Sequence, residues 1–279
     1  MPTMPAVLMP FAQIVALLLA AAHTLLTTLG LAPDSGATWV LAIAGLTVAV
    51  RTLLLPLTVH GVKLARSSAN ARPALDEMRK RYEGRTDLDS LRAMREEQLA
   101  IQAEHGVPRA GCLPMLLQLP ILFALYGVLS AVARGDAIGA MDASLVSSLG
   151  SAHVAGVGLA ERLGSWGALT TDPTHLAVIV LLALTSAGLS YATMRWFSLP
   201  NMVLTGMPAA MVDVQKMMPM LSALGLLFAA AAVPVGLLVY WVASNAYTLV
   251  QQAVVTRWFP TPGSPAHDAW LARHGTSAA

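Results

Sequence analysis

Residues 39–57 read WVLAIAGLTVAVRTLLLPL, an apolar run long enough to cross a bilayer, and Arg51 lies inside it. The Arg51 guanidinium keeps its proton at any ordinary pH. Placing such a charge at the centre of a membrane helix costs from about 2.5 to more than 10 kcal/mol. The side chain either extends to the inner interface, about 9 Å of helix away, or lies in a hydrated cavity among helices. In both cases polar groups must surround it.

The composition is that of an integral membrane protein. Hydrophobic residues make up 56% of the chain and charged residues 11%, with a mean hydropathy of +0.64. Cys112 is the only cysteine, which excludes an intramolecular disulfide and a multi-cysteine metal site. The formal net charge of +2 is too small to indicate a nucleic-acid ligand. We therefore expect no direct sequence-specific nucleic-acid partner.

Five runs of about 20 apolar residues predict an all-α fold with a five-helix transmembrane core. Pro234 and Gly236 divide the last two runs, because proline removes an amide donor and glycine permits a tight reversal. A single long helix through this point is the alternative. The predicted divisions are an N-terminal segment (1–36), the spans 37–58, 112–132, 174–195, 216–232 and 234–256, the loops 59–111, 133–173 and 196–215, and a tail (257–279).

Residues 5–29 are also apolar, but no lysine or arginine flanks them. The missing positive region argues against a signal peptide. Gln13, His23 and three threonines make this segment more amphipathic than the five spans. It either crosses the membrane or lies in its outer interface, and we favour the interfacial helix.

The distribution of basic residues predicts the orientation. Ten of the seventeen lysines and arginines fall in residues 59–111. With five crossings, Arg195, Lys216, Arg257 and Arg273 lie on the same side as this loop, and positively charged loops stay in the cytoplasm. The start of the chain is therefore predicted outside, and the 59–111 loop and the tail inside.

The 59–111 loop is predicted to form a helical hairpin. Leu75, Met78 and Tyr82 share one helical face, and a second apolar stripe follows Gly84 and a cap-like Thr86. Most of its mixed charges are interpreted as a solvated surface. The outer loop, residues 133–173, has no regular period, and we assign it no chemistry.

Polar residues in the last span share one helix face. Trp241, Asn245, Thr248 and Gln252 recur at intervals of four, three and four residues. Taken alone, they are interpreted as interhelical hydrogen-bond partners. No acidic residue lies within any predicted span to neutralise Arg51, however. One hydrated groove, lined also by Gln118 of the second span, accounts for all these residues together.

Motifs for catalysis are absent from the sequence. It contains no His-Glu-x-x-His, no Gly-x-Ser-x-Gly, no P-loop and no acid within a span. We therefore predict no catalytic residues, no metal, no cofactor and no enzymatic activity.

Three stretches in this order resemble the YidC/Oxa/Alb family of membrane protein insertases. They are VRTLLLPL (50–57), GCLPMLLQLPILFALY (111–126) and PVGLLVYWVASN (234–245), the last followed by Gln251 and Gln252. Within this family the chain is most similar to short actinobacterial members, because it lacks a large extracytoplasmic domain and has a Pro-Gly-Ser tail after Phe259. The tail is short and only modestly basic, which argues against ribosome binding through a long cationic tail.

The resemblance implies a hydrophilic groove, closed on the outside and open to the cytoplasm and to lipid. It also implies a bacterial plasma-membrane protein that inserts and helps fold nascent membrane proteins without ATP, with an N-terminal outer helix. Nascent chains and membrane lipids are the implied partners, with the Sec translocon, the ribosome and signal-recognition components as further ones. The expected groove residues are Arg51, Gln118, Tyr126, Tyr240, Trp241, Asn245, Thr248 and Gln252.

Two rival functions remain at this point. Arg51 in a small-solute transporter or anion channel would bind an anion, although no internal repeat of the kind common in transporters is found. An assembly chaperone would hold partner helices without inserting them.

Overall fold

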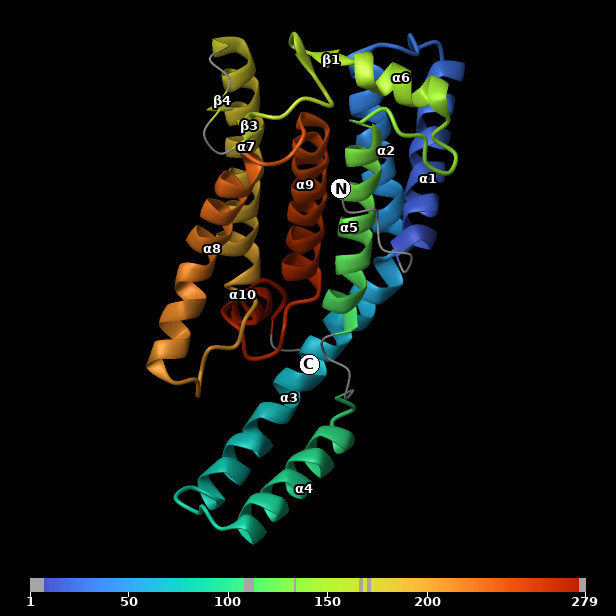
Figure 1. The fold of residues 1–279 in the computed structure, drawn as a ribbon. Helices are drawn as coiled ribbons and strands as arrows, with labels where there is room; N and C mark the ends of the chain where they lie inside the picture. Colours follow the sequence, from blue (N-terminus) through green and yellow to red (C-terminus); the bar gives the residue numbers. More distant parts are fainter. Residues whose placement is uncertain (1–7, 108–112, 133, 166–167, 170–171, 276–279) are drawn as a thin grey trace. The chain divides into compact units, whose positions relative to one another are not determined.

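The chain is mostly helical in a computed structural model, which describes residues 8–107, 113–132, 134–165, 168–169 and 172–275 (Figure 1). The helices are α1 (Met9–Thr28), α2 (Gly36–Leu53), α3 (Leu55–Arg81), α4 (Leu88–Glu104), α5 (Leu113–Val132), α6 (Ala143–Ser151), α7 (Pro173–Ala192), the π-helix η2 (Thr193–Ser198), α8 (Ala209–Ala230), α9 (Val235–Trp258) and α10 (Pro265–His274). Two antiparallel pairs of two-residue strands are β1 (His153–Val154) with β2 (Val157–Gly158), and β3 (Gly164–Ser165) with β4 (Ala168–Leu169).

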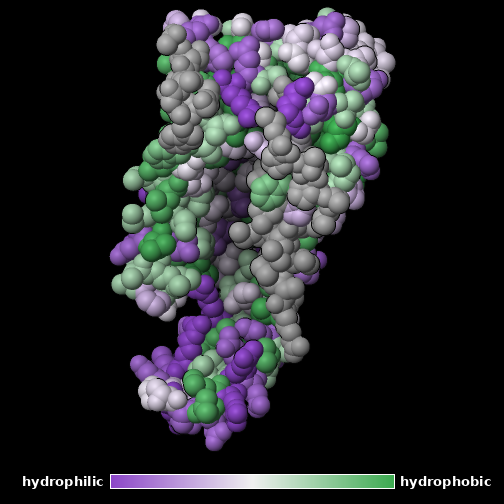
Figure 2. All heavy atoms as spheres, in the orientation of Figure 1, coloured by the Kyte–Doolittle hydropathy of each residue, from purple (hydrophilic) through white to green (hydrophobic). Residues whose placement is uncertain are grey.

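Apolar helices indicate a multi-pass membrane protein. Among the described residues, α1, α2, α7 continued by η2, and α8 are long and apolar enough to cross a membrane. Exposed apolar side chains cover α8, and Figure 2 shows its surface as largely hydrophobic. Such a surface suits contact with lipid.

The chain divides into two compact units. The first contains Met1–Leu54, Met115–Thr193 and Pro219–Val250, and the second contains Leu55–Pro114, Met194–Met218 and Gln251–Ala279. The boundary at Leu54 falls inside the apolar run that the sequence pattern presents as one span. Pro56 lies in the first turn of α3, where proline is tolerated because the amide it lacks would have no helical partner. The predicted span 37–58 therefore ends at Leu53, and its last residues begin the next helix.

In the first unit, α1 packs along α2. The core includes Leu19 of α1, Trp39 and Ile43 of α2, Val128 of α5 and Leu238 of α9, all almost completely buried. Each of these side chains comes from an apolar face of its helix, so apolar packing joins helices that are distant in sequence.

His23 and the threonines of α1 have hydrogen-bond partners within the first unit, whereas Gln13 is exposed. His23 is buried, stacks on the Trp39 ring at 4.1 Å and donates from Nε2 to the Pro33 carbonyl at 2.8 Å. The hydroxyls of Thr24, Thr27 and Thr28 donate to backbone carbonyls of the same helix. Because these groups need no water, they do not confine α1 to the membrane surface.

The outer loop contains more order than its sequence suggests. Asp142 accepts from the Leu145 amide at 2.9 Å and caps α6, a helix that the sequence analysis did not predict. Trp39 Nε1 donates to Ser148 Oγ at 3.0 Å, and the Ser148 hydroxyl donates to the Pro33 carbonyl at 3.1 Å. These bonds hold α6 against the start of α2.

Backbone amides of α9 make the close contact between this helix and the outer loop. The amide of Val235 donates to the Glu161 carbonyl at 2.9 Å, and that of Gly236 donates to the Leu159 carbonyl at 2.8 Å. A Cβ atom at Gly236 would lie 3.3 Å from the Leu159 oxygen. Gly236 therefore permits this approach inside the first turn of α9, and the chain reversal expected before Pro234 lies at residues 231–234.

In the second unit, α3 and α4 pack against each other. Arg81 of α3 forms an ion pair with Glu97 of α4, and Met78 is buried. The N-cap of α4 is Asp87, which accepts from the Ser90 amide at 2.8 Å, so the expected cap at Thr86 is wrong by one residue. A further difference from the predicted boundaries is that α8 begins at Ala209, in the segment expected to be a loop.

Candidate functional site

Arg51 lies in the last turn of α2 and is half-buried. Its Nη2 donates to the Ser244 hydroxyl of α9 at 2.6 Å, and both residues belong to the first unit. A cation near a helix C-terminus is also stabilised by the helix dipole. Among the described residues, no carboxylate forms an ion pair with Arg51. The structure therefore gives this charge a neutral polar partner.

The polar residues of α9 point to different partners. Ser244 is buried, and its carbonyl accepts from the Thr248 hydroxyl at 2.8 Å. Asn245 Nδ2 donates to the Ser186 hydroxyl of α7 at 2.9 Å and to the Trp241 carbonyl, also at 2.9 Å. Ser244, which is not a member of the predicted stripe, contacts Arg51, whereas Asn245 of the stripe joins α9 to α7.

The aromatic residues expected along the groove differ in exposure. Tyr240 is 7% exposed and belongs to the apolar core, whereas Trp241 is half-buried and packs against that core. Tyr126 of α5 is 39% exposed. Tyr126 therefore offers the most accessible aromatic surface of these three.

Two of the expected groove residues cannot be placed beside Arg51. The side chain of Gln118 lies outside the described residues, and Gln252 belongs to the second unit. The groove containing Arg51, Gln118, Asn245 and Thr248 stays a prediction. The direct contact that the structure shows for Arg51 is its hydrogen bond to Ser244.

Sequence reasoning missed Ser244 and Ser186. Ser244 is three residues after Trp241 and four before Thr248, so it also fits the helical stripe in which Asn245 was counted. Ser186 lies on the buried face of α7 with Ala183 and Ser190. Small and hydroxyl residues at such intervals are typical of helix interfaces in membranes, a signal that could have identified this face.

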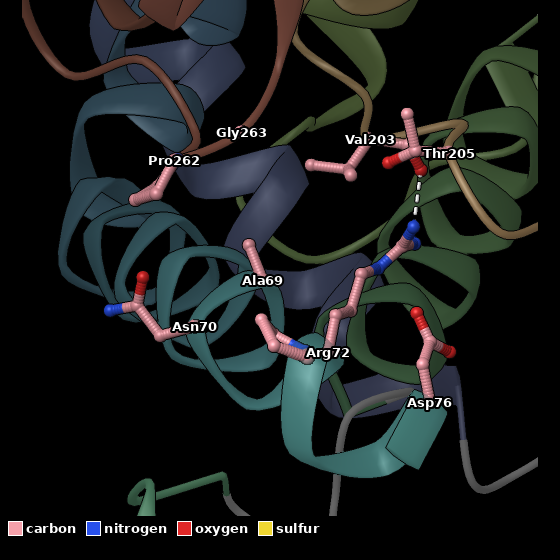
Figure 3. A pocket seen from close by; sticks show the side chains of 9 residues that line it. Ala69, Asn70, Arg72, Asp76, Val203, Thr205, Pro262 and Gly263 are labelled. Carbon is pink, nitrogen blue, oxygen red and sulfur yellow. Dashed lines mark hydrogen bonds between the residues drawn. The ribbon is translucent and has the colours of Figure 1, made fainter. Parts of the chain in front are cut away.

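A pocket of about 480 Å³ lies in the second unit, between α3 and the loops at 199–208 and 259–264. Figure 3 shows Arg72 reaching toward Val203, whose carbonyl accepts from Nη1, with Asp76 on the same side of the pocket. Gly206 has φ +77°, and a Cβ there would lie 3.1 Å from Asp76 Oδ2. These contacts hold the second half of α3 to the loop before α8, but they do not by themselves define a ligand.

Comparisons with known proteins agree with the motifs in the sequence. A family model described as 60Kd inner membrane protein matches residues 30–262. The membrane protein insertase YidC of Streptomyces avermitilis is 34% identical over 250 residues, covering 86% of this chain and 56% of the relative. The relatives of the same name from Tropheryma whipplei strain Twist and Bifidobacterium longum are 29% and 31% identical, covering 96% and 88% of this chain and 89% and 73% of the relatives. The chain thus spans little more than half of the Streptomyces protein and most of the other two.

Proposed function

The chain belongs to the 60Kd inner membrane protein family, and on this premise we propose that it inserts nascent membrane proteins into the bilayer. The names of its relatives, membrane protein insertase YidC, support this activity. Insertion would take place in the bacterial plasma membrane, with the α3–α4 pair and the C-terminal tail in the cytoplasm. Insertion would proceed without ATP, since the sequence has no P-loop.

The observation that carries the proposal is the neutral partner of Arg51. One hydrogen bond to Ser244 leaves most of the guanidinium donors available for another group. Unit charges 4 Å apart attract by about 1 kcal/mol in water and by about 4 kcal/mol at an effective dielectric of 20. A half-buried Arg51 would therefore attract an acidic segment of a substrate more strongly than an exposed arginine would.

The driving force would come from the substrate itself. Transfer of an apolar helix into lipid contributes about 25 cal/mol per Å² of buried apolar surface. A hydrated groove at Arg51, Gln118, Asn245 and Thr248 would lower the barrier because the polar tail of the substrate would keep its hydrogen-bond partners during transfer. Tyr126, Tyr240, Trp241 and Gln252 would complete the substrate path.

Further partners belong to the same proposal. The α3–α4 pair has exposed charges of both signs, which suit contact with soluble components. It would receive substrates from the ribosome or signal-recognition components, and the Sec translocon would cooperate in the membrane.

The test measures insertion of single-span substrates with acidic or neutral N-terminal tails into liposomes that contain the purified full-length protein. We expect Arg51→Ala to slow insertion of the acidic-tailed substrate roughly tenfold, equivalent to about 1.4 kcal/mol of barrier, and the neutral-tailed substrate much less. Arg51→Lys should retain part of the activity because it keeps the charge. Ser244→Ala should preserve the preference for acidic tails.

Arg134→Gln is the matched control, since Arg134 is exposed and bonds Asp136 in the outer loop. Normal insertion of acidic-tailed substrates by both Arg51 variants would refute the role of this charge. Binding of substrates without insertion would indicate a holding chaperone. Anion flux through the same liposomes that disappears in Arg51→Ala would instead indicate a channel or transporter.

A further inference from the structure

A second pocket, of about 300 Å³, lies within the second unit where η2, the end of α9 and α10 meet. Its lining includes Trp196, Arg257 and Arg273. The Thr256 hydroxyl donates to the Phe197 carbonyl at 3.2 Å, and the Ala266 amide donates to the Pro200 carbonyl at 2.9 Å. The pocket walls are therefore tied together by hydrogen bonds across the three segments.

Two guanidinium groups in this pocket have no acidic partner in the described part of the chain. Neither Arg257 nor Arg273 forms an ion pair with any described residue. Asp268, the acid of α10, is exposed and does not line the pocket. Asp268 precedes Arg273 by five residues, a rotation of about 140° around the helix. The pocket thus presents two positive charges that α10 leaves uncompensated.

The surroundings of the pocket indicate a membrane surface. Trp196 and Phe197 lie in the last turn of an apolar helix, Pro173–Ser198, that is long enough to span a bilayer. Trp196 is 65% exposed, and Trp258 at the end of α9 is 58% exposed. Exposed tryptophans at the ends of membrane helices are typical of the lipid headgroup region.

We propose that Arg257 and Arg273 bind the phosphate of an anionic phospholipid headgroup in this pocket. Guanidinium groups bind phosphate oxygens with paired, charge-assisted hydrogen bonds. Among the described residues, no carboxylate lines the pocket to pair with the amine of a zwitterionic headgroup, so an anionic lipid is favoured. An RNA strand is disfavoured, because tight binding of a nucleic-acid backbone generally uses several phosphate contacts along an extended basic surface. Lipid binding here requires the membrane location but not the insertion activity.

The test is native mass spectrometry of the full-length protein in detergent, titrated separately with phosphatidylglycerol, phosphatidylcholine and inorganic phosphate. We expect one tightly bound phosphatidylglycerol, and at least tenfold weaker binding in the Arg257→Gln/Arg273→Gln variant. Arg257→Lys/Arg273→Lys should lose less, because it keeps both charges. The control Arg134→Gln/Arg162→Gln removes the same net charge from the outer loop and should bind within twofold of the wild type.

Several results would overturn this proposal. Equal loss in the control variant would mean that net charge, rather than this pocket, governs lipid binding. Inorganic phosphate or phosphatidylcholine binding as tightly as phosphatidylglycerol would exclude an anionic lipid site. Binding of a labelled RNA oligonucleotide that is lost in the glutamine variant, while phosphatidylglycerol binding is unchanged, would assign the arginines to nucleic acid. If the double glutamine variant does not fold, Arg273→Gln alone provides the comparison, and unaltered affinity for phosphatidylglycerol in that variant would also contradict the proposal.

Discussion

Asp87 at the start of α4 is a residue whose charge state contributes to local stability. The amide and hydroxyl of Ser90 hold the pKa of the Asp87 carboxyl below its ordinary value of 3.8. Because the folded value is the lower one, the stabilisation is present above the unfolded pKa and is lost as the pH falls through the folded value. We expect carboxyl ¹³C NMR of the full-length protein to show Asp87 titrating below 3.8, and Ser90→Ala to raise its pKa.

The hydrogen bond from the backbone amide of residue 90 to the Asp87 carboxylate persists in Ser90→Ala, so this substitution should raise the Asp87 pKa only in part. An Asp87 pKa at or above 3.8 in the wild type would show that the capping bond is not formed.

Single residues also show where sequence reasoning about the site succeeds and where it stops. Arg51 can be identified from the sequence because a permanent charge in an apolar run is rare and costly. Its partner Ser244 cannot, since serine is common in membrane helices and neighbouring positions 244 and 245 both fit the stripe. Which of the two faces Arg51 depends on the rotation of α9, and this is set by packing between helices.

At the scale of elements, the approach of β1 to the first turn of α2 depends on Gly36. A Cβ atom at this position would lie 1.8 Å from the His153 carbonyl oxygen, so backbone would have to move. Overpacking of this kind typically costs about 1–3 kcal/mol. We predict that Gly36→Ala lowers the thermal unfolding midpoint of the protein in detergent.

Gly188→Ala is the control for this substitution, because a Cβ atom at Gly188 in α7 would meet no atom of another described segment within 4 Å. Replacing an open helical glycine by alanine is favourable by up to about 1 kcal/mol. Equal midpoints for the two variants would mean that the loop and α2 are farther apart than the structure indicates.

Long apolar helices are predictable from the sequence, whereas short elements and helix boundaries are less so. The turn between α8 and α9 follows from Pro234, since proline cannot continue a helix. By contrast, α6 is nine residues long and depends on the Asp142 cap and on contact with Trp39. The early start of α8 at Ala209 was not predicted, because Asp213, Gln215 and Lys216 interrupt the apolar pattern of this segment.

At the scale of the whole molecule, the composition and three sequence motifs were sufficient to predict a helical membrane protein and its family. The division into two units was not predictable from the same information. Its boundary at Leu54 cuts through a continuous apolar run, and hydropathy does not change there. A helix end at Leu53 and a proline in the first turn of α3 mark this boundary, and both become meaningful only when the packing around them is known.

The position of α1 decides whether the chain crosses the membrane five or six times. This helix is long and apolar enough to span, and its threonines are satisfied by its own backbone. The positive-inside rule still favours the loop 59–111 as cytoplasmic in both arrangements. We predict that α1 lies at the outer surface, so that the N-terminus and the outer loop are on the same side.

Cysteine labelling tests this topology in a Cys112→Ser background, which removes the only native thiol. Cysteines replacing Thr3, Asp89 and Ser144 are treated in turn with a membrane-impermeant maleimide on intact cells stripped of outer layers. Positions 3 and 144 should react from outside, and position 89 only after permeabilisation, because ten basic residues keep its loop in the cytoplasm. Position 144 serves as the outer reference and position 89 as the inner one. If position 3 reacts only after permeabilisation while the two references behave as expected, α1 crosses the bilayer and the protein has six membrane helices.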